Sequence, residues 1–197
     1  MKPGACSLSP HIVLREAGLP FDLVKVDLAT KKTEDGGDFL AVNPKGQVPT
    51  LGLDEGGILT EGSVIVQYVA DRAPDSGLLP GLGSLERYRV LEWLNFIGTE
   101  LHKTFSPLFR PNTPEEYKAI VKQTLAAKFT IVNEALEGKA YLTGDRFTAA
   151  DAYCFTVLRW ARPMGFDLKD WPNLAVYMAR LAERPAVAAT LAAEGVG

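Results

Sequence analysis

The sequence has few of the features that mark membrane, secreted or disulfide-rich proteins. Its longest apolar runs, residues 63–70 and 186–193, are too short to cross a bilayer. Residues 1–11 lack the apolar stretch of a signal peptide. Only two cysteines occur, Cys6 and Cys154, and they lie far apart. We therefore expect a cytoplasmic protein with two free thiols and no membrane partner.

Charge of one sign and low-complexity sequence are also scarce. The formal net charge is -3, which argues against nucleic acid as the main partner because phosphate binding favours a basic surface. A local basic pocket for a small anion is still allowed. Apolar residues make up 47% of the chain and charged residues 23%, so the chain can bury a substantial core.

Helix and strand signals mix in the first third of the chain. The predicted elements are a helix at 7–17 ended by Gly18, a strand at 21–28, a loop at 29–38, short strands at 48–53 and 58–60 around a turn, and an apolar helix from Ser63. This order needs one more strand before the first helix to complete a thioredoxin-like sheet. Only five residues precede Cys6, so that strand is nearly absent.

The remainder of the chain predicts helices alone. A stretch rich in Pro and Gly at 73–84 is the best linker candidate. Beyond it, helices are expected at 85–109, 114–137, 149–161, 174–183 and 186–194. We therefore predict an α/β thioredoxin-like N-terminal domain at 1–73, a linker at 74–83 and an all-α C-terminal helical domain at 84–197.

Cys6 is the strongest candidate for chemistry. It stands at the start of the first helix, where the helix dipole and unpaired N–H groups stabilise a thiolate, so we expect the pKa of its thiol to be lowered. The segment Cys6-x-x-Ser9 has a single thiol and would form a mixed disulfide with an outside thiol. The alternative is an inert, small apolar side chain.

Two further motifs fit a small peptide with charged ends. A proline at Pro49 can be cis and can leave the backbone of Val48 free to pair with a bound peptide; the alternative is an ordinary turn before an edge strand. Glu61 can accept from an ammonium group, and the helix start after it can bind a carboxylate. The alternative there is a plain N-cap by Ser63 beside a solvated Glu61.

The helical part contains a polar stripe and a capping motif. The stripe can face solvent or line a cleft, and its histidine, His102, could donate a hydrogen bond to a sulfur or exchange a proton with that sulfur. Thr148 and Asp151 form a Thr-x-x-Asp capping signature, which we interpret as structural. The stripe consists of Asn95, Thr99, His102 and Lys103, at i, i+4, i+7 and i+8 of one helix.

Together these residues resemble the glutathione transferase superfamily, and within it the bacterial beta class. The resemblance covers essentially the whole chain. It rests on the order and spacing of PGACSLSPHIVLREAGLPF, VDLATKKTEDGGDFLAVNPKGQVPTL, LTEGSVIVQYVAD, RYRVLEWLNFIGTELHKTFSPLF and FTAADAYCFTVLRWA. Beta-class chains usually begin with about four more residues that form the first strand. Either the sequence omits residues that the molecule has, or the first strand is shortened, which would leave backbone groups of the neighbouring strands unpaired.

The resemblance implies a role for each matching residue. Cys6 would contact the glutathione sulfur, and Val48 would pair with the cysteinyl backbone. Glu61 and Gly62 would form the γ-glutamyl site, and Lys31 would lie near the glycyl end. The stretch of the second domain that closes over the ligand is matched by Asn95, Thr99, Glu100, Leu101 and His102, with His102 near the sulfur.

The resemblance also implies the activity, which is conjugation of the glutathione thiol to small hydrophobic electrophiles. Glutathione would be the co-substrate, no metal would be needed, and the enzyme would be a homodimer. Cys6 and His102 would polarise the sulfur, whereas a mixed disulfide on Cys6 would give thiol–disulfide exchange or peroxide reduction.

Two other hypotheses remain open: a monothiol oxidoreductase of glutaredoxin type, and a non-catalytic binding module of the same fold. Affinity for glutathione and the effect of removing Cys6 would distinguish them from a transferase. Cys154 is expected to be a buried helix thiol. The side chains expected to shape the electrophile pocket are Phe105, Phe109, Trp160 and Met164.

Overall fold

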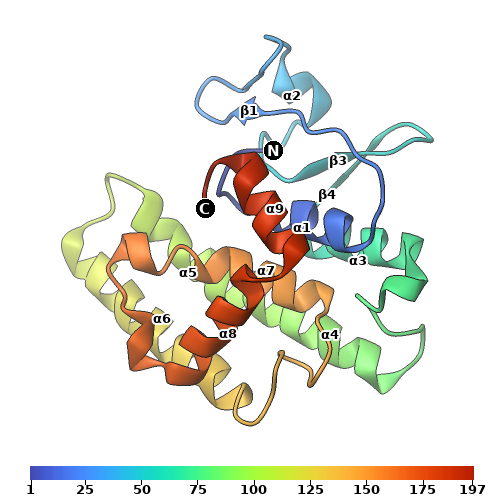
Figure 1. Ribbon diagram of the computed structural model, residues 1–197. Coiled ribbons are helices and arrows are strands. Elements are labelled where there is room, and N and C mark those ends of the chain that lie inside the picture. The colour runs from blue at the N-terminus through green and yellow to red at the C-terminus, as the bar shows by residue number, and fades with distance from the viewer.

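The computed structural model, which describes residues 1–197, is built around the helix α7 (Ala149–Leu158) (Figure 1). Every residue of α7 is buried, because its sequence AADAYCFTVL is almost wholly apolar and leaves no face for solvent. Two helices of the N-terminal part, α1 (Leu8–Glu16) and α3 (Gly62–Arg72), pack directly on it. A single apolar core therefore joins the two parts of the chain.

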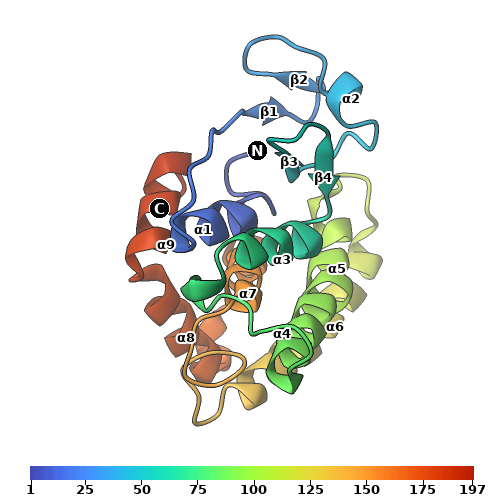
Figure 2. The same ribbon diagram turned by 90° about the vertical axis from the view of Figure 1, so that its right-hand side faces the viewer.

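The N-terminal part contains two separate pairs of short strands (Figure 2). β1 (Val26–Asp27) pairs antiparallel with β2 (Lys32–Thr33), next to the short helix α2 (Phe39–Val42). β3 (Thr50–Gly52) pairs antiparallel with β4 (Ile58–Thr60), with Leu51 opposite Leu59. The strands predicted around the turn at 54–57 are confirmed, whereas the loop predicted at 29–38 contains β2.

A cavity of about 900 Å³ lies between the extended segments 19–24 and 49–54. Only Met1 reaches the edge of the first segment: its amino group donates to the carbonyl of Val24, and its carbonyl accepts from the N–H of Val26 at 2.9 Å. This is the pairing of a parallel ladder. Most of the predicted strand at 21–28 is consequently wrong, because residues 21–23 make no backbone hydrogen bond, and just before β1 only the carbonyls of Val24 and Lys25 pair with backbone nitrogens, those of Met1 and Glu34.

The helical part agrees with the predicted order, and one predicted helix is broken. The expected helix at 85–109 is interrupted after Phe96 by a π-helical turn, η2 (Ile97–His102), and it tightens to a 3₁₀ turn around Pro107. No helix is long and apolar enough to span a membrane. The helices of this part are α4 (Leu85–Phe96), α5 (Lys103–Phe105), α6 (Glu115–Ala135), α8 (Pro172–Ala182) and α9 (Pro185–Glu194), with 3₁₀ turns η1 (Pro74–Ser76), η3 (Ser106–Phe109), η4 (Arg162–Met164) and η5 (Leu168–Asp170).

The predicted cap of α7 is present, and it extends into the core. The carboxylate of Asp151 accepts from the N–H and the hydroxyl of Thr148, each at 2.8 Å. It also accepts from the N–H of Leu142 and the hydroxyl of Tyr177, both at 2.9 Å. A fully buried carboxylate is tolerated here because four donors replace its water.

We expect Asp151→Ala to lower the free energy of unfolding by about 3 kcal/mol, because several buried donors lose their acceptor at once. Urea unfolding measures this change. Asp167→Ala is the matched control, since the exposed Asp167 accepts a single bond, from the N–H of Lys169 at 3.0 Å. Equal losses in the two variants would contradict the structural role of Asp151.

Candidate functional site

The turn that precedes α1 brings Cys6 against Val48. The Cys6 Sγ donates to the Val48 carbonyl at 3.1 Å, across 42 positions of sequence. Cys6 is partly buried and Val48 is buried. A thiol that donates to a carbonyl carries its proton, so Cys6 is held as a neutral thiol in this state.

The expectation of a lowered Cys6 pKa is wrong for this state of the protein. Burial raises the pKa of the Cys6 thiol to about 11, and the N–H groups of Cys6 and Ser7 offset only part of that shift. α1 begins two residues later, at Leu8, so Cys6 lies outside the first turn of the helix. Desolvation of the thiolate therefore outweighs the helix dipole at this position.

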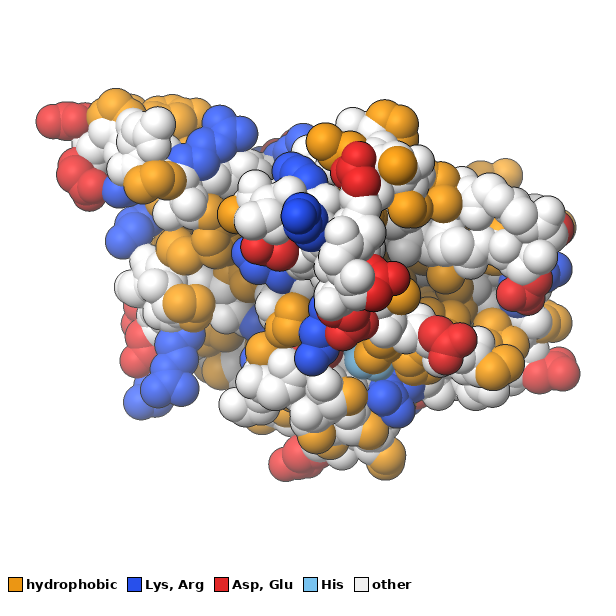
Figure 3. Space-filling model, turned by 90° about the horizontal axis from the view of Figure 1, so that it is seen from above, with side chains coloured by type: hydrophobic (Ala, Val, Ile, Leu, Met, Phe, Trp, Pro, Cys, Tyr) orange, Lys and Arg blue, Asp and Glu red, His pale blue; other side chains and the backbone are white.

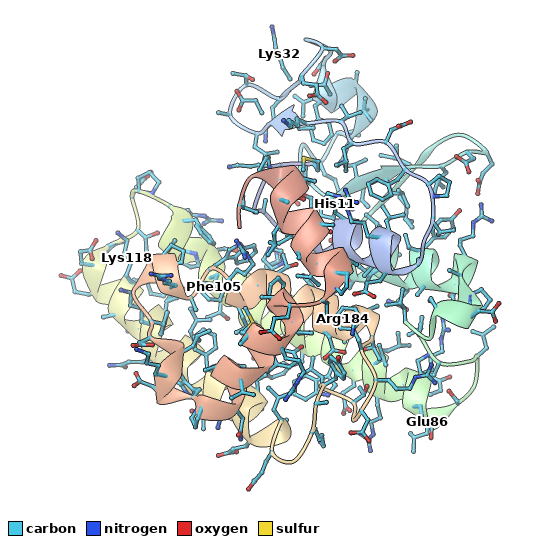
Figure 4. The ribbon with its side chains drawn as sticks, in the orientation of Figure 1. His11, Lys32, Glu86, Phe105, Lys118 and Arg184 are labelled. Atoms are coloured by element: carbon cyan, nitrogen blue, oxygen red, sulfur yellow. The ribbon has the colours of Figure 1, made fainter.

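The backbone of Gly4, two residues before Cys6, is held at both its N–H and its carbonyl. Its N–H donates to Oε2 of Glu194 at 2.9 Å, and its carbonyl accepts from Nε1 of Trp160 at 3.0 Å. The other carboxylate oxygen of Glu194 lies 2.9 Å from Nδ1 of His11, in a buried pair where α1 meets α9 (Figure 4). The last helix of the chain thereby anchors the turn that carries Cys6.

The backbone of Val48 lies at the edge next to β3. The Val48–Pro49 peptide bond is cis, as the motif allows. The Val48 N–H donates to no backbone group of the chain, so it is free to pair with a ligand. Gly62, at the first turn of α3, lies against the ring of Pro49, and a Cβ added there would be 3.6 Å from Pro49 Cγ.

Glu61 is at the N-cap position of α3, and its exposed carboxylate makes no capping hydrogen bond. The alternative of an N-cap at Ser63 does not hold, because the helix already begins at Gly62. Nζ of Lys45 lies 2.8 Å from the Glu61 carboxylate and 2.9 Å from the Thr60 hydroxyl. Both partners of this ion pair are more than half exposed, so a ligand can replace it at little cost.

Lys31 lies in the turn between β1 and β2, and its Nζ donates to the carbonyl of Gly46 at 2.8 Å. Lys31 and Glu61 are the two non-glycine residues with positive φ, at 58° and 69°. Such backbone is costly for residues with a Cβ and is found preferentially at functional sites. Both residues were named from the sequence as glutathione contacts, a role that stays a prediction.

His102 ends the π-helical turn and faces the core of the site. Its Nδ1 lies 2.7 Å from the hydroxyl of Tyr153 on α7. Its ring packs edge-on against Trp160, with the centroids 5.0 Å apart. Burial, with a smaller effect from the neighbouring Lys103 ammonium, lowers the pKa of His102 to about 4, so the imidazole is neutral at pH 7.

The polar stripe predicted along this helix does not form a single face. The π-helical turn changes the angle between successive residues, so His102 turns inward while Lys103 remains exposed. Leu101 is fully buried in the core. Asn95 and Thr99 are exposed, and the Glu100 carboxylate pairs with Lys128 of α6 at 2.7 Å.

The aromatic side chains expected to form a pocket divide into core and surface members. Phe105 is fully buried, whereas Phe109 is half exposed and packs against Trp160 with the ring centroids 5.3 Å apart. Met164 is partly buried against the core. Trp160 and Phe109 therefore form an apolar wall beside His102. Cys154 is buried, as predicted.

Sequence reasoning missed three residues of this site. Tyr153 was overlooked because it lies within an apolar helix segment, Lys45 because a loop lysine is usually solvated, and Glu194 because it is far away in sequence. No three His, Cys, Asp or Glu side chains gather in a way that could hold a metal ion. The face seen from above, where the N-terminal part lies, has basic and acidic side chains interspersed (Figure 3).

Comparison with known proteins assigns both parts of the chain to related families. The family described as "Glutathione S-transferase, N-terminal domain" matches residues 4–72, and "Glutathione S-transferase, C-terminal domain" matches residues 96–185. Glutathione S-transferase GstA of Escherichia coli O157:H7 is 56% identical over 99% of this chain and 97% of its own length.

Two solved structures are similar along the whole chain. The bacterial beta-class glutathione S-transferase of Sphingomonas chungbukensis superimposes with a TM-score of 0.96 at 48% identity. A sphingomonad glutathione S-transferase complexed with glutathione gives the same values, and each comparison covers 100% of this chain and 98% of the other. These likenesses confirm the predicted fold class.

We expect Glu194→Gln to lower the free energy of unfolding by about 2 kcal/mol, because the amide cannot accept from both Gly4 and His11 without turning its NH₂ group toward a donor. Thermal and urea unfolding measure the loss. Glu183→Gln, at an exposed position just after α8, is the control. Unchanged stability of the Glu194 variant would show that the clamp on Gly4 contributes little.

Proposed function

The chain belongs to the glutathione S-transferase family, and we propose that it binds glutathione along the Val48 backbone with the sulfur beside Cys6 and His102. It is a glutathione S-transferase enzyme that conjugates glutathione, close to the bacterial beta class. The observation that carries the proposed site is the contact between the Cys6 sulfur and the Val48 carbonyl at 3.1 Å.

The arrangement of polar groups supports this orientation of the tripeptide. The free N–H of Val48 can pair with the cysteinyl backbone as an added strand would. The N-terminus of α3, at Gly62, can bind the γ-glutamyl carboxylate, and Glu61 can accept from the γ-glutamyl ammonium. Lys31 would meet the glycyl carboxylate at the opposite end. The sulfur then falls between these ends, next to Cys6.

The helical part supplies the other side of the proposed site. His102 would lie at the sulfur, and Trp160 with Phe109 would offer an apolar surface to a small hydrophobic electrophile. Asn95 at the end of α4 and Thr99, Glu100 and Leu101 of the π-helical turn would belong to the stretch that closes over the ligand. The reaction is attack of the glutathione sulfur on the electrophile, with the thiolate held by hydrogen-bond donors in a partly dry site.

A second activity, thiol–disulfide exchange, is favoured by the difference in accessibility between the two cysteines. Cys6 is partly accessible, whereas Cys154 is fully buried and cannot resolve a disulfide with it. Ser9, three residues after Cys6, is buried as well. With glutathione disulfide, Cys6 would therefore form a mixed disulfide and release one glutathione, and a second glutathione would be needed to regenerate the thiol.

The proposed organisation has residues 1–73 as the glutathione-binding domain, 84–197 as the helical domain and 74–83 as the linker. Because both cysteines are free thiols, we also propose a cytoplasmic location.

We further propose a homodimer. In its favour, α3 and α4, joined by the bidentate Arg87–Asp71 pair, leave Val64, Leu85 and Tyr88 exposed.

We expect Cys6→Ala to retain glutathione binding and conjugation of a small aromatic electrophile while losing the mixed disulfide. The physical reason is that His102 and the Val48 backbone remain, whereas the exchanging sulfur is gone. Calorimetric titration with glutathione, a conjugation assay and intact-protein mass spectrometry after glutathione disulfide treatment measure the three properties. Cys154→Ala is the control and should keep the glutathione adduct.

If Cys6→Ala loses both conjugation and disulfide exchange, Cys6 is the nucleophile in both reactions. Absence of glutathione binding in the parent protein would contradict the proposed glutathione site.

Sedimentation at micromolar concentration should give a particle of twice the 21.4 kDa chain mass. Leu85→Glu with Tyr88→Glu should shift it toward the monomer, because buried unpaired charges oppose association. Ile131→Glu is the control, since it replaces a similarly exposed apolar side chain on α6. A monomeric parent protein would contradict the proposed assembly.

A further inference from the structure

Tyr153 and His102 form a pair that no residue pattern in the sequence indicated. Tyr153 comes from the central helix α7 and His102 from the π-helical turn, and the two ring planes are nearly perpendicular, at 82°. Trp160 packs on the imidazole as well. Because α7 is buried along its whole length, Tyr153 is a rigid partner for a histidine on an irregular turn.

The hydrogen-bond partners of this pair determine which imidazole nitrogen carries the proton. His102 Nδ1 is the only hydrogen-bond partner of the Tyr153 hydroxyl, at 2.7 Å. A buried hydroxyl without an acceptor is costly, so the phenol donates to Nδ1. A neutral imidazole has one N–H, which is then on Nε2. Nε2 makes no hydrogen bond within the protein, so it is available to a ligand.

The protonation states agree with this assignment. Burial lowers the pKa of His102 to about 4, and burial, followed by the Cys6 and Glu61 charges, raises the pKa of Tyr153 above its usual value. Both groups are therefore neutral across the physiological range. The ionisable groups that bear on the pair are Lys103, Cys6 and Glu61.

We propose that Tyr153 is a positioning residue that holds His102 as an Nε2–H donor to the glutathione sulfur, so that His102 acts as a hydrogen-bond donor and not as the base. This inference rests on the proposed function, because it needs the sulfur beside His102. The thiol proton of glutathione leaves to solvent on binding, and the Nε2–H then donates to the thiolate. No proton passes through His102.

The tautomer can be tested in the free enzyme, without glutathione. The chain has only two histidines, so imidazole ¹⁵N NMR has two sets of signals, and His102→Gln assigns them. The two should differ. His11 accepts from Nε of Arg15 on Nε2 at 3.1 Å and so carries its proton on Nδ1, which donates to Glu194. We expect a protonated Nε2 on His102, and a protonated Nδ1 there would overturn the proposal.

The effect on chemistry is measured with Tyr153→Phe. The apparent pKa of the bound glutathione thiol, followed by its thiolate ultraviolet absorbance, should rise, and kcat near pH 7 should fall about 10-fold, the factor that corresponds to one hydrogen bond. The KM for glutathione should change far less, because its backbone contacts remain. An unchanged thiol pKa and kcat in a folded variant would overturn the proposal.

The matched control is Tyr177→Phe, which removes another buried hydroxyl, one that donates to Asp151 and not to His102. It should lower the melting temperature and leave the thiol pKa unchanged. If the control shifts the thiol pKa as much as Tyr153→Phe does, the effect is one of general packing and the proposal is wrong. Failure of the parent enzyme to bind glutathione would refute the proposed site, while the NMR result would still decide the tautomer.

Discussion

The candidate site depends on the backbone of Gly4, which is held at both its N–H and its carbonyl. Oε2 of Glu194, in the last helix, accepts from the Gly4 N–H, and Nε1 of Trp160, two residues after the end of α7, donates to the Gly4 carbonyl. Cys6 follows two residues later and reaches Val48 only while this turn stays in place. Burial of the Glu194 carboxylate would be costly by itself, but hydrogen bonds from Gly4 and His11 replace the hydrogen bonds to water that it loses. The two ends of the chain thereby become parts of one site.

Burial makes the reacting part of the site electrically neutral. It raises the pKa of the Cys6 thiol, lowers that of the His102 imidazole and raises that of the Tyr153 phenol. Of the two charged groups, Glu61 is exposed and Lys31 is partly buried. An anionic sulfur would thus meet neutral donors in a poorly hydrated environment, where each hydrogen bond to a developing charge is stronger than in water.

Local features could be predicted from the sequence because they depend on neighbouring residues. Gly18 ends α1 with a positive φ of 66°, and Asp151 caps α7 three residues after Thr148. The turn at 54–57 joins β3 and β4 as the sequence pattern indicates. The segment around Cys6 and the cis Pro49 were also recognisable, because each short motif has few structural solutions.

What the sequence by itself determined is therefore the order of the helices, the cap of α7, the candidate residues and, through resemblance, the family. The tertiary structure alone decided their chemical state. The pKa of the Cys6 thiol is raised, not lowered, because segments distant in sequence bury this residue. His102 separates from the polar stripe because the π-helical turn rotates its side chain toward Tyr153. Desolvation and hydrogen-bond partners are set by residues far apart in the chain, so no local pattern can predict them.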